Sequence, residues 1–147
     1  MAGKRESILT PSLEHASVGD AMRPGIISCP PDATVVKVAR QMATHHVHSV
    51  FVMHPGEGDS EQPYVWGIIS DLHLLEAALR HDPTQPASSL AAEPVIWVKP
   101  EMSLSQAAEL MVKNHVSHLV VVEGETLRPI GVLSTTDVAE AFAWGEG

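Results

Sequence analysis

The chain contains two copies of one sequence pattern. When the 147-residue sequence is laid on itself with a shift of 69, the segment from Met22 to Met53 aligns with the segment from Ala91 to Val122. Identical residues stand at Ile27 and Ile96, at Pro31 and Pro100, at Met42 and Met111, and at His46 and His115. Beyond a loop at 54–64 the shift is 64, and Gly67 then aligns with Gly131 and Ser70 with Ser134. A copy of about 60 residues buries little core by itself, so the duplication predicts two repeats packed sheet against sheet.

The residue pattern of each copy predicts a short helical turn followed by the element order β-α-β-β-α. Two helices have apolar residues at the i, i+3, i+4 and i+7 spacing of a helix with one buried face. These residues are Val35, Val38, Ala39 and Met42 in one copy and Leu104, Ala107, Ala108 and Met111 in the other. The other expected elements are turns at 18–22 and 88–92, strands at 26–29, 50–53, 64–69, 95–98, 119–122 and 128–133, and last helices at 71–80 and 135–143. Ser103 and Gln106 are expected to form a capping box. The predicted fold class is α/β (α+β), with two tandem repeats related by pseudo-two-fold symmetry.

The composition is that of a globular protein, and it excludes several kinds of partner. Hydrophobic residues make up 44% of the chain and charged residues 18%. The formal charge of −9 repels phosphate backbones, so we expect no nucleic-acid interface. No apolar run approaches the roughly 18 to 20 residues that span a membrane, and Cys29 is the single cysteine, so no intrachain disulfide can form. We therefore expect a cytoplasmic protein, with residues 1–15 as a disordered tail.

The repeat resembles the CBS (cystathionine-β-synthase) domain, whose tandem pair is called a Bateman module. The resemblance is carried by Gly67-Ile68-Ile69-Ser70-Asp71-Leu72-His73 and Gly131-Val132-Leu133-Ser134-Thr135-Thr136-Asp137, together with the runs 46–52 and 115–121. The family form is glycine, two aliphatic residues, serine or threonine, two variable residues and aspartate. The second copy fits this form throughout, whereas the first has His73 in place of the aspartate. The resemblance implies repeats at 16–80 and 88–144, joined by a linker at 81–87.

The second motif has residue types that suit a nucleotide. Ser134 falls where a strand ends and a helix begins, and helix N-termini present amide donors that favour phosphate. Asp137 lies one turn into that helix, and a carboxylate can accept hydrogen bonds from the two adjacent hydroxyls of a ribose. The hydroxyls of Ser134 and Thr136 are expected to complete this contact.

The resemblance also implies that each cleft takes residues from both repeats. The expected ligand-binding residues are Ile27, Val47, His48, Ser49, Val132, Ser134, Thr136 and Asp137. Among these, Ile27 and Val132 would form apolar walls for a purine, and His48 lies where relatives often place a basic residue against phosphate. A weaker second cleft is expected at Ile68, Ser70, His73, Ile96, Val116, Ser117 and His118, because it lacks the carboxylate.

Together these inferences favour a non-catalytic regulatory module that senses an adenosyl ligand. The expected ligand is AMP, ADP or ATP, with S-adenosylmethionine as a further candidate. The sequence has no glycine-rich phosphate loop followed by lysine, no Gly-x-Ser-x-Gly and no His-Glu-x-x-His, so we expect no catalytic residues, no resident cofactor and no metal. The implied partners are a regulated protein of unknown identity and a second copy of the chain, paired as a homodimer through its helices, including one with Ala141, Phe142 and Trp144.

Two other functions remain open at this point. One is a structural dimerisation module with vestigial clefts, which is favoured by His73 and by the absence of the family's proline at Phe51 and Val120. The other is a metal or redox sensor built on Cys29 and the histidines at 45, 46 and 48.

Overall fold

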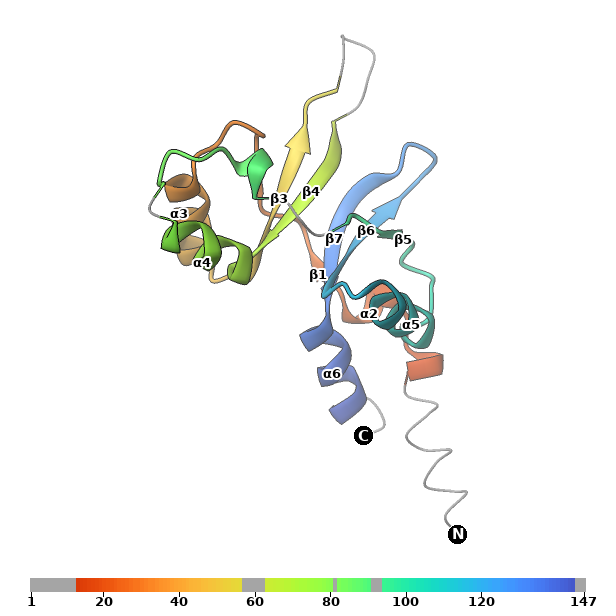
Figure 1. The fold of residues 1–147 in the computed structure, drawn as a ribbon. Helices are drawn as coiled ribbons and strands as arrows, with labels where there is room; N and C mark the ends of the chain where they lie inside the picture. The colour runs from red at the N-terminus through yellow and green to blue at the C-terminus, as the bar shows by residue number, and fades with distance from the viewer. Residues whose placement is uncertain (1–12, 57–62, 81, 91–93, 145–147) are drawn as a thin grey trace. The chain divides into compact units, whose positions relative to one another are not determined.

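The described part of the chain forms two compact units. The computed structural model describes residues 13–56, 63–80, 82–90 and 94–144, and Figure 1 labels their helices and strands. Unit 2 is one continuous segment, Ile26–Val95, whereas unit 1 joins the chain up to Gly25 with the chain from Ile96 onward. Each unit therefore holds the body of one repeat together with the segment that precedes the body of the other. Of the expected tail, residues 1–12 lie outside the described residues, and residues 13–15 are helical rather than disordered.

Unit 2 is a three-stranded sheet with two α-helices. Its sheet has the order β2-β3-β4, with β2 parallel to β3 and β3 antiparallel to β4. The elements are β2 (Ser28–Cys29), α3 (Val35–His45), β3 (Ser49–His54), β4 (Tyr64–Ser70), α4 (Asp71–Leu79) and the 3-10 helix η1 (Ala87–Ser89). The last element stands where a turn at 88–92 is expected, and residues 91–92 of that turn lie outside the described residues.

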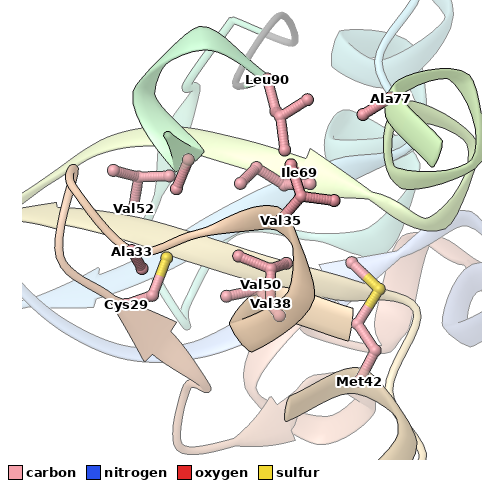
Figure 2. Packing of buried hydrophobic residues seen from close by; sticks show 11 residues of the cluster. Cys29, Ala33, Val35, Val38, Met42, Val50, Val52, Ile69, Ala77 and Leu90 are labelled. Carbon is pink, nitrogen blue, oxygen red and sulfur yellow. The ribbon is translucent and has the colours of Figure 1, made fainter. Parts of the chain in front are cut away.

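The core of unit 2 is built from the apolar stripe of α3 and the inward face of its sheet. Val35, Val38 and Met42 of α3 belong to one buried cluster with Val50, Val52 and Ile69 of the strands, as Figure 2 shows. Because full burial of one such side chain contributes about 1.5–3 kcal/mol, this cluster is the main stabilising feature of the unit.

The described part of the expected linker at 81–87 is held against the start of α3. The amide of Ala87 donates to the carbonyl of Ala33 at 2.7 Å. The carbonyl of Gln85 accepts from the amide of Val35 at 3.1 Å. Residue 81 lies outside the described residues.

Unit 1 has the same plan with one additional strand. Its sheet has the order β1-β7-β6-β5, in which only the β5–β6 pair is parallel. The elements are α2 (Val18–Ala21), β1 (Arg23–Pro24), β5 (Trp97–Val98), α5 (Leu104–Asn114), β6 (His118–Glu123), β7 (Arg128–Ser134) and α6 (Thr135–Trp144). Amides of Val18 and Gly19 donate to the carbonyls of Met102 and Pro100 at 2.8 and 2.9 Å, which holds α2 beside the start of α5.

The short strand β1 is not predicted by the periodicity. It pairs antiparallel with β7 at the edge of the sheet, with Arg23 opposite Val132 and Pro24 opposite Gly131. A proline is tolerated there because an edge strand leaves some amide positions without a ladder partner. The approach is so close that a Cβ on Gly131 would lie 2.5 Å from the carbonyl oxygen of Arg23.

The remaining strands and helices confirm the predicted order to within about two residues at each end, the usual uncertainty of such boundaries. Ser103 and Gln106 form the expected capping box at the start of α5. Across the described ranges, no helix combines the length and apolar character needed to cross a bilayer.

Two histidines end the equivalent helices α3 and α5 in the left-handed conformation. His46 and His115 both have φ of 53°. In this conformation the Cβ of an L-residue crowds the following carbonyl oxygen, whereas glycine has no such penalty. The motif position that these histidines occupy therefore carries a local backbone cost.

We predict that His115→Gly raises the free energy of unfolding by about 0.5–1 kcal/mol, because it relieves the left-handed backbone. Urea denaturation followed by circular dichroism measures the change. Lys113→Gly, two residues earlier and inside α5, is the control and should lower the same quantity by about 0.5–1 kcal/mol. A loss of stability in His115→Gly of the size seen in Lys113→Gly would contradict the prediction.

Candidate functional site

The motif of the second repeat forms a reciprocal cap at the junction of β7 and α6. The backbone amide of Ser134 donates to Asp137 Oδ2 at 2.8 Å, and the amide of Asp137 donates to Ser134 Oγ at 3.2 Å. Each side chain thus satisfies a backbone donor at the start of the helix, as in a capping box. The cap fixes the rotamer of Asp137 and places a carboxylate at the point where the chain leaves the sheet.

The carboxylate of Asp137 also has an ion-pair partner from the other end of the sequence. Arg23 Nε in β1 donates to Asp137 Oδ1 at 3.3 Å. The Asp137 side chain is only 4% exposed, whereas that of Arg23 is 54% exposed. The candidate diol acceptor is therefore covered and paired in this structure. Because the two residues are 114 positions apart in the sequence, no local sequence signal predicts this contact.

The start of α6 offers fewer amide donors than a bare helix end. The amide of Thr135 donates to the carbonyl of Ser117 at 3.0 Å, and the amide of Asp137 is taken by Ser134. The side chain of Thr136 is exposed and that of Val132 is half-buried in β7. The hydroxyl of Ser134 accepts within the cap, so its first role is to start the helix.

The first repeat has the same reciprocal cap at the start of α4, with His73 in place of the aspartate. The amide of Ser70 donates to His73 Nδ1 at 3.2 Å, and the amide of His73 donates to Ser70 Oγ at 3.3 Å. The amide of Asp71 donates to the carbonyl of His48 at 3.0 Å, as Thr135 does to Ser117. An imidazole nitrogen therefore caps α4 where a carboxylate caps α6, and only the second repeat has an anionic acceptor at this position.

The other residues that the sequence assigns to the cleft of Asp137 lie in unit 2. The carbonyl of Ile27 accepts from the amide of Phe51 at 2.8 Å, and the amide of Val47 donates to the carbonyl of Met42 at 3.2 Å. His48 is exposed, and its Nδ1 lies 3.2 Å from Asp71 Oδ2. Ser49 begins β3 opposite Ser70. His48 thus has an acidic neighbour within its own unit.

The expected second cleft also has residues in each unit. Ile68, Ser70 and His73 belong to unit 2, and Ile68 is fully buried in β4. In unit 1 the amide of Val116 donates to the carbonyl of Met111 at 3.1 Å, and the carbonyl of Ile96 accepts from Val120 at 3.0 Å. Ser117 Oγ lies 2.9 Å from Nδ1 of His118, which is buried in β6 opposite Ser134.

Cys29 has the environment of a core residue. It is 4% exposed within the cluster of unit 2. Burial raises the pKa of its thiol from 9.0 to about 11, and the charge of Lys37 opposes this only in part. A thiol of this kind has very little reactive thiolate at neutral pH. In the described ranges, no group of three or more histidine, cysteine, aspartate or glutamate residues is placed to hold a metal ion.

We predict that Cys29 of the folded protein reacts slowly with a thiol reagent at pH 8, and that unfolding in guanidinium restores rapid labelling. Because burial raises the pKa of Cys29 to about 11, the thiolate fraction at pH 8 is roughly a hundredfold lower than for an unperturbed thiol. The double variant Cys29→Ala with Glu140→Cys places a thiol on an exposed helix position and is the control. Equal labelling rates for Cys29 and this control would contradict the prediction.

Comparison with known protein families assigns the repeat. The sequence profile described as "CBS domain" matches residues 18–80 and 87–143, which together are most of the chain. The chain is 26% identical over 126 residues to the CBS domain-containing protein YhcV of Bacillus subtilis, with 84% of each protein covered. Three other curated relatives are 26–29% identical, and the chain spans between 54% and 64% of their lengths.

Solved structures share the fold at low sequence identity. The CBS domain of the bacterial CNNM/CorC family Mg²⁺ transporter in complex with ATP has a TM-score of 0.76 and 19% identity, with 95% of this chain and 97% of that chain covered. The CBS domain pair of protein MJ0100 in complex with 5-methylthioadenosine and S-adenosyl-L-methionine has a TM-score of 0.73 and 17% identity, with 87% of this chain and 96% of that chain covered.

Proposed function

The chain belongs to the CBS domain family, with two copies of the domain, and from this premise we propose that it is a regulatory module that binds an adenine nucleotide through Asp137. The observation that carries the proposal is the buried carboxylate fixed by Ser134 at the junction of β7 and α6. The module acts by binding rather than by chemistry, and a partner protein reads the bound state.

The acceptor capacity of Asp137 supports this role. A carboxylate has about four lone-pair positions. Ser134 takes one and the exposed Arg23 takes another, so the carboxylate can accept the adjacent hydroxyls of a ribose at the positions that Ser134 does not hold. The related structures were solved with ATP, with 5-methylthioadenosine and with S-adenosyl-L-methionine, three molecules that share an adenosine group. An adenosyl ligand is therefore the class that fits both observations.

The remaining parts of the proposed site follow the family resemblance. Val132 of unit 1 forms an apolar wall for the purine, and the resemblance alone assigns Ile27, Val47, His48 and Ser49 of unit 2 to the same ligand. The motif of the first repeat binds the same ligand weakly or not at all, because the imidazole nitrogen of His73 replaces the carboxylate as the cap of α4.

We predict that Asp137→Asn removes the thermal stabilisation by AMP, ADP, ATP or S-adenosylmethionine. At a ligand concentration of 100 Kd the native state of the unmodified protein gains about 2.7 kcal/mol, which raises Tm by roughly 5–10 °C for a chain of this size. Differential scanning fluorimetry measures the shift.

Glu140→Gln is the matched control, since it removes one negative charge from an exposed position one turn further along α6. It should keep the full shift. An equal Tm shift in Asp137→Asn and Glu140→Gln would show that the carboxylate of Asp137 does not bind the ligand. The absence of a shift in the unmodified protein with every one of the four ligands would contradict the proposed function.

A second candidate function is dimerisation without a ligand, and exposed helix faces favour it. Leu72, Leu75 and Leu79 of α4 are 60%, 60% and 77% exposed. They recur at the i, i+3 and i+7 spacing of one helix face. In α6, Phe142 and Trp144 are also exposed. Exposed apolar side chains along one helix face are costly in water and are typical of a protein interface.

We predict that the double variant Leu75→Lys with Leu79→Lys converts a homodimer of the chain to a monomer, because two charges are placed in the apolar contact. Size-exclusion chromatography with light scattering measures the mass. Val112→Lys, on an exposed apolar position of α5, is the control and should leave the mass unchanged. A monomeric unmodified protein would contradict the dimer, and a dimer that binds no nucleotide would favour the structural function.

A further inference from the structure

The ion pair between Arg23 and Asp137 joins an exposed side chain to a buried one. Asp137 is held on its other oxygen by the amide of Ser134 and is buried. Arg23 uses only Nε for the contact, at 3.3 Å, and more than half of its side chain is exposed. Among the hydrogen bonds of the described residues, none involves its two terminal nitrogens. The contact is therefore the single-donor kind rather than the two-donor fork that makes arginine–carboxylate pairs strong.

We propose that Arg23 occupies the carboxylate of Asp137 in the ligand-free chain, and that a bound ligand exchanges it for the two hydroxyls of its ribose. This inference rests on the proposed function. The released guanidinium then pairs with a phosphate of the ligand. Arg23 is thus a specificity-determining residue that opposes neutral nucleosides and favours phosphorylated ones.

Burial favours this exchange. While Arg23 is in place the Asp137 side chain is 4% exposed and Oδ1 is paired, so a ribose must displace the guanidinium to use that oxygen. The cap with Ser134 cannot open without loss of the first hydrogen bonds of α6, whereas the arginine side chain can rotate into solvent. A ligand that removes the guanidinium loses the energy of the ion pair. A ligand with a phosphate offers the guanidinium a second anion and recovers part of that energy.

The fold positions Arg23 for this role. Its backbone lies in β1 opposite Val132, and the amide of Gly25 donates to the carbonyl of Ile130 at 2.7 Å. Only a residue without a Cβ at position 131 permits this approach, because a Cβ there would lie 2.5 Å from the Arg23 carbonyl oxygen. The residues that align with Arg23 and Asp137 in the other copies of the pattern are Ala92 and His73, which cannot form an ion pair of this kind.

Isothermal titration of adenosine and AMP into the unmodified protein and into Arg23→Met tests the exchange. Methionine keeps the length and the apolar stem of the side chain but has no donor. Adenosine should bind roughly two- to tenfold more tightly to Arg23→Met, as expected for the removal of a partly exposed ion pair. AMP should gain less than adenosine or lose affinity, so the ratio of AMP affinity to adenosine affinity should fall.

Arg40→Met removes an exposed arginine of α3 and should leave both affinities unchanged. Arg23→Gln replaces Arg23→Met if circular dichroism shows that the latter is unfolded. If the unmodified protein binds adenosine and the Arg23 variant binds it no more tightly, the exchange is overturned and the proposed function stands. If neither protein binds adenosine or AMP, the proposed function fails and the exchange fails with it.

Discussion

The reciprocal hydrogen bonds between a serine at the end of a strand and the residue three positions later determine where the last helix of each repeat begins. In the second repeat this pair is Ser134 and Asp137, and in the first it is Ser70 and His73. Because both partners are held by backbone amides, the side chain three positions after the serine, Asp137 or His73, has little rotational freedom. The position of the carboxylate is therefore a result of helix capping, and Arg23 of strand β1 lies beside it.

The two repeats show how one backbone arrangement can support different chemistry. A carboxylate and an imidazole nitrogen both accept the amide hydrogen of the capping serine, so the fold tolerates either. The carboxylate also keeps a negative charge in a place with little water, and such a charge requires a partner. Arg23 is that partner in unit 1. The asymmetry between the repeats is thus chemical, at a junction whose geometry is nearly the same.

The sequence alone predicts most of the elements and only part of the site. The stripes from Val35 to Met42 and from Leu104 to Met111 indicate helices because their spacing matches the helical period, and both helices occur. The capping serines could likewise be read from a spacing of three residues. Strand β1 could not, since two residues with a proline have no period. The pairing of Arg23 with Asp137 could not either, because it depends on how the ends of the chain meet within unit 1.

Unit 1 is formed by two segments that are far apart in the sequence, and this has a consequence for biosynthesis. Unit 2 is complete as soon as residue 95 has left the ribosome, because all of its strands lie in one continuous segment. Strand β1 emerges before unit 2, yet among the strands of the described residues its neighbour β7 is translated last. At about 5–20 residues per second, the nascent N-terminal segment waits on the order of 5–20 s for the edge that it joins. The two halves of this duplicated protein therefore mature in a fixed order, with the half that contains Asp137 second.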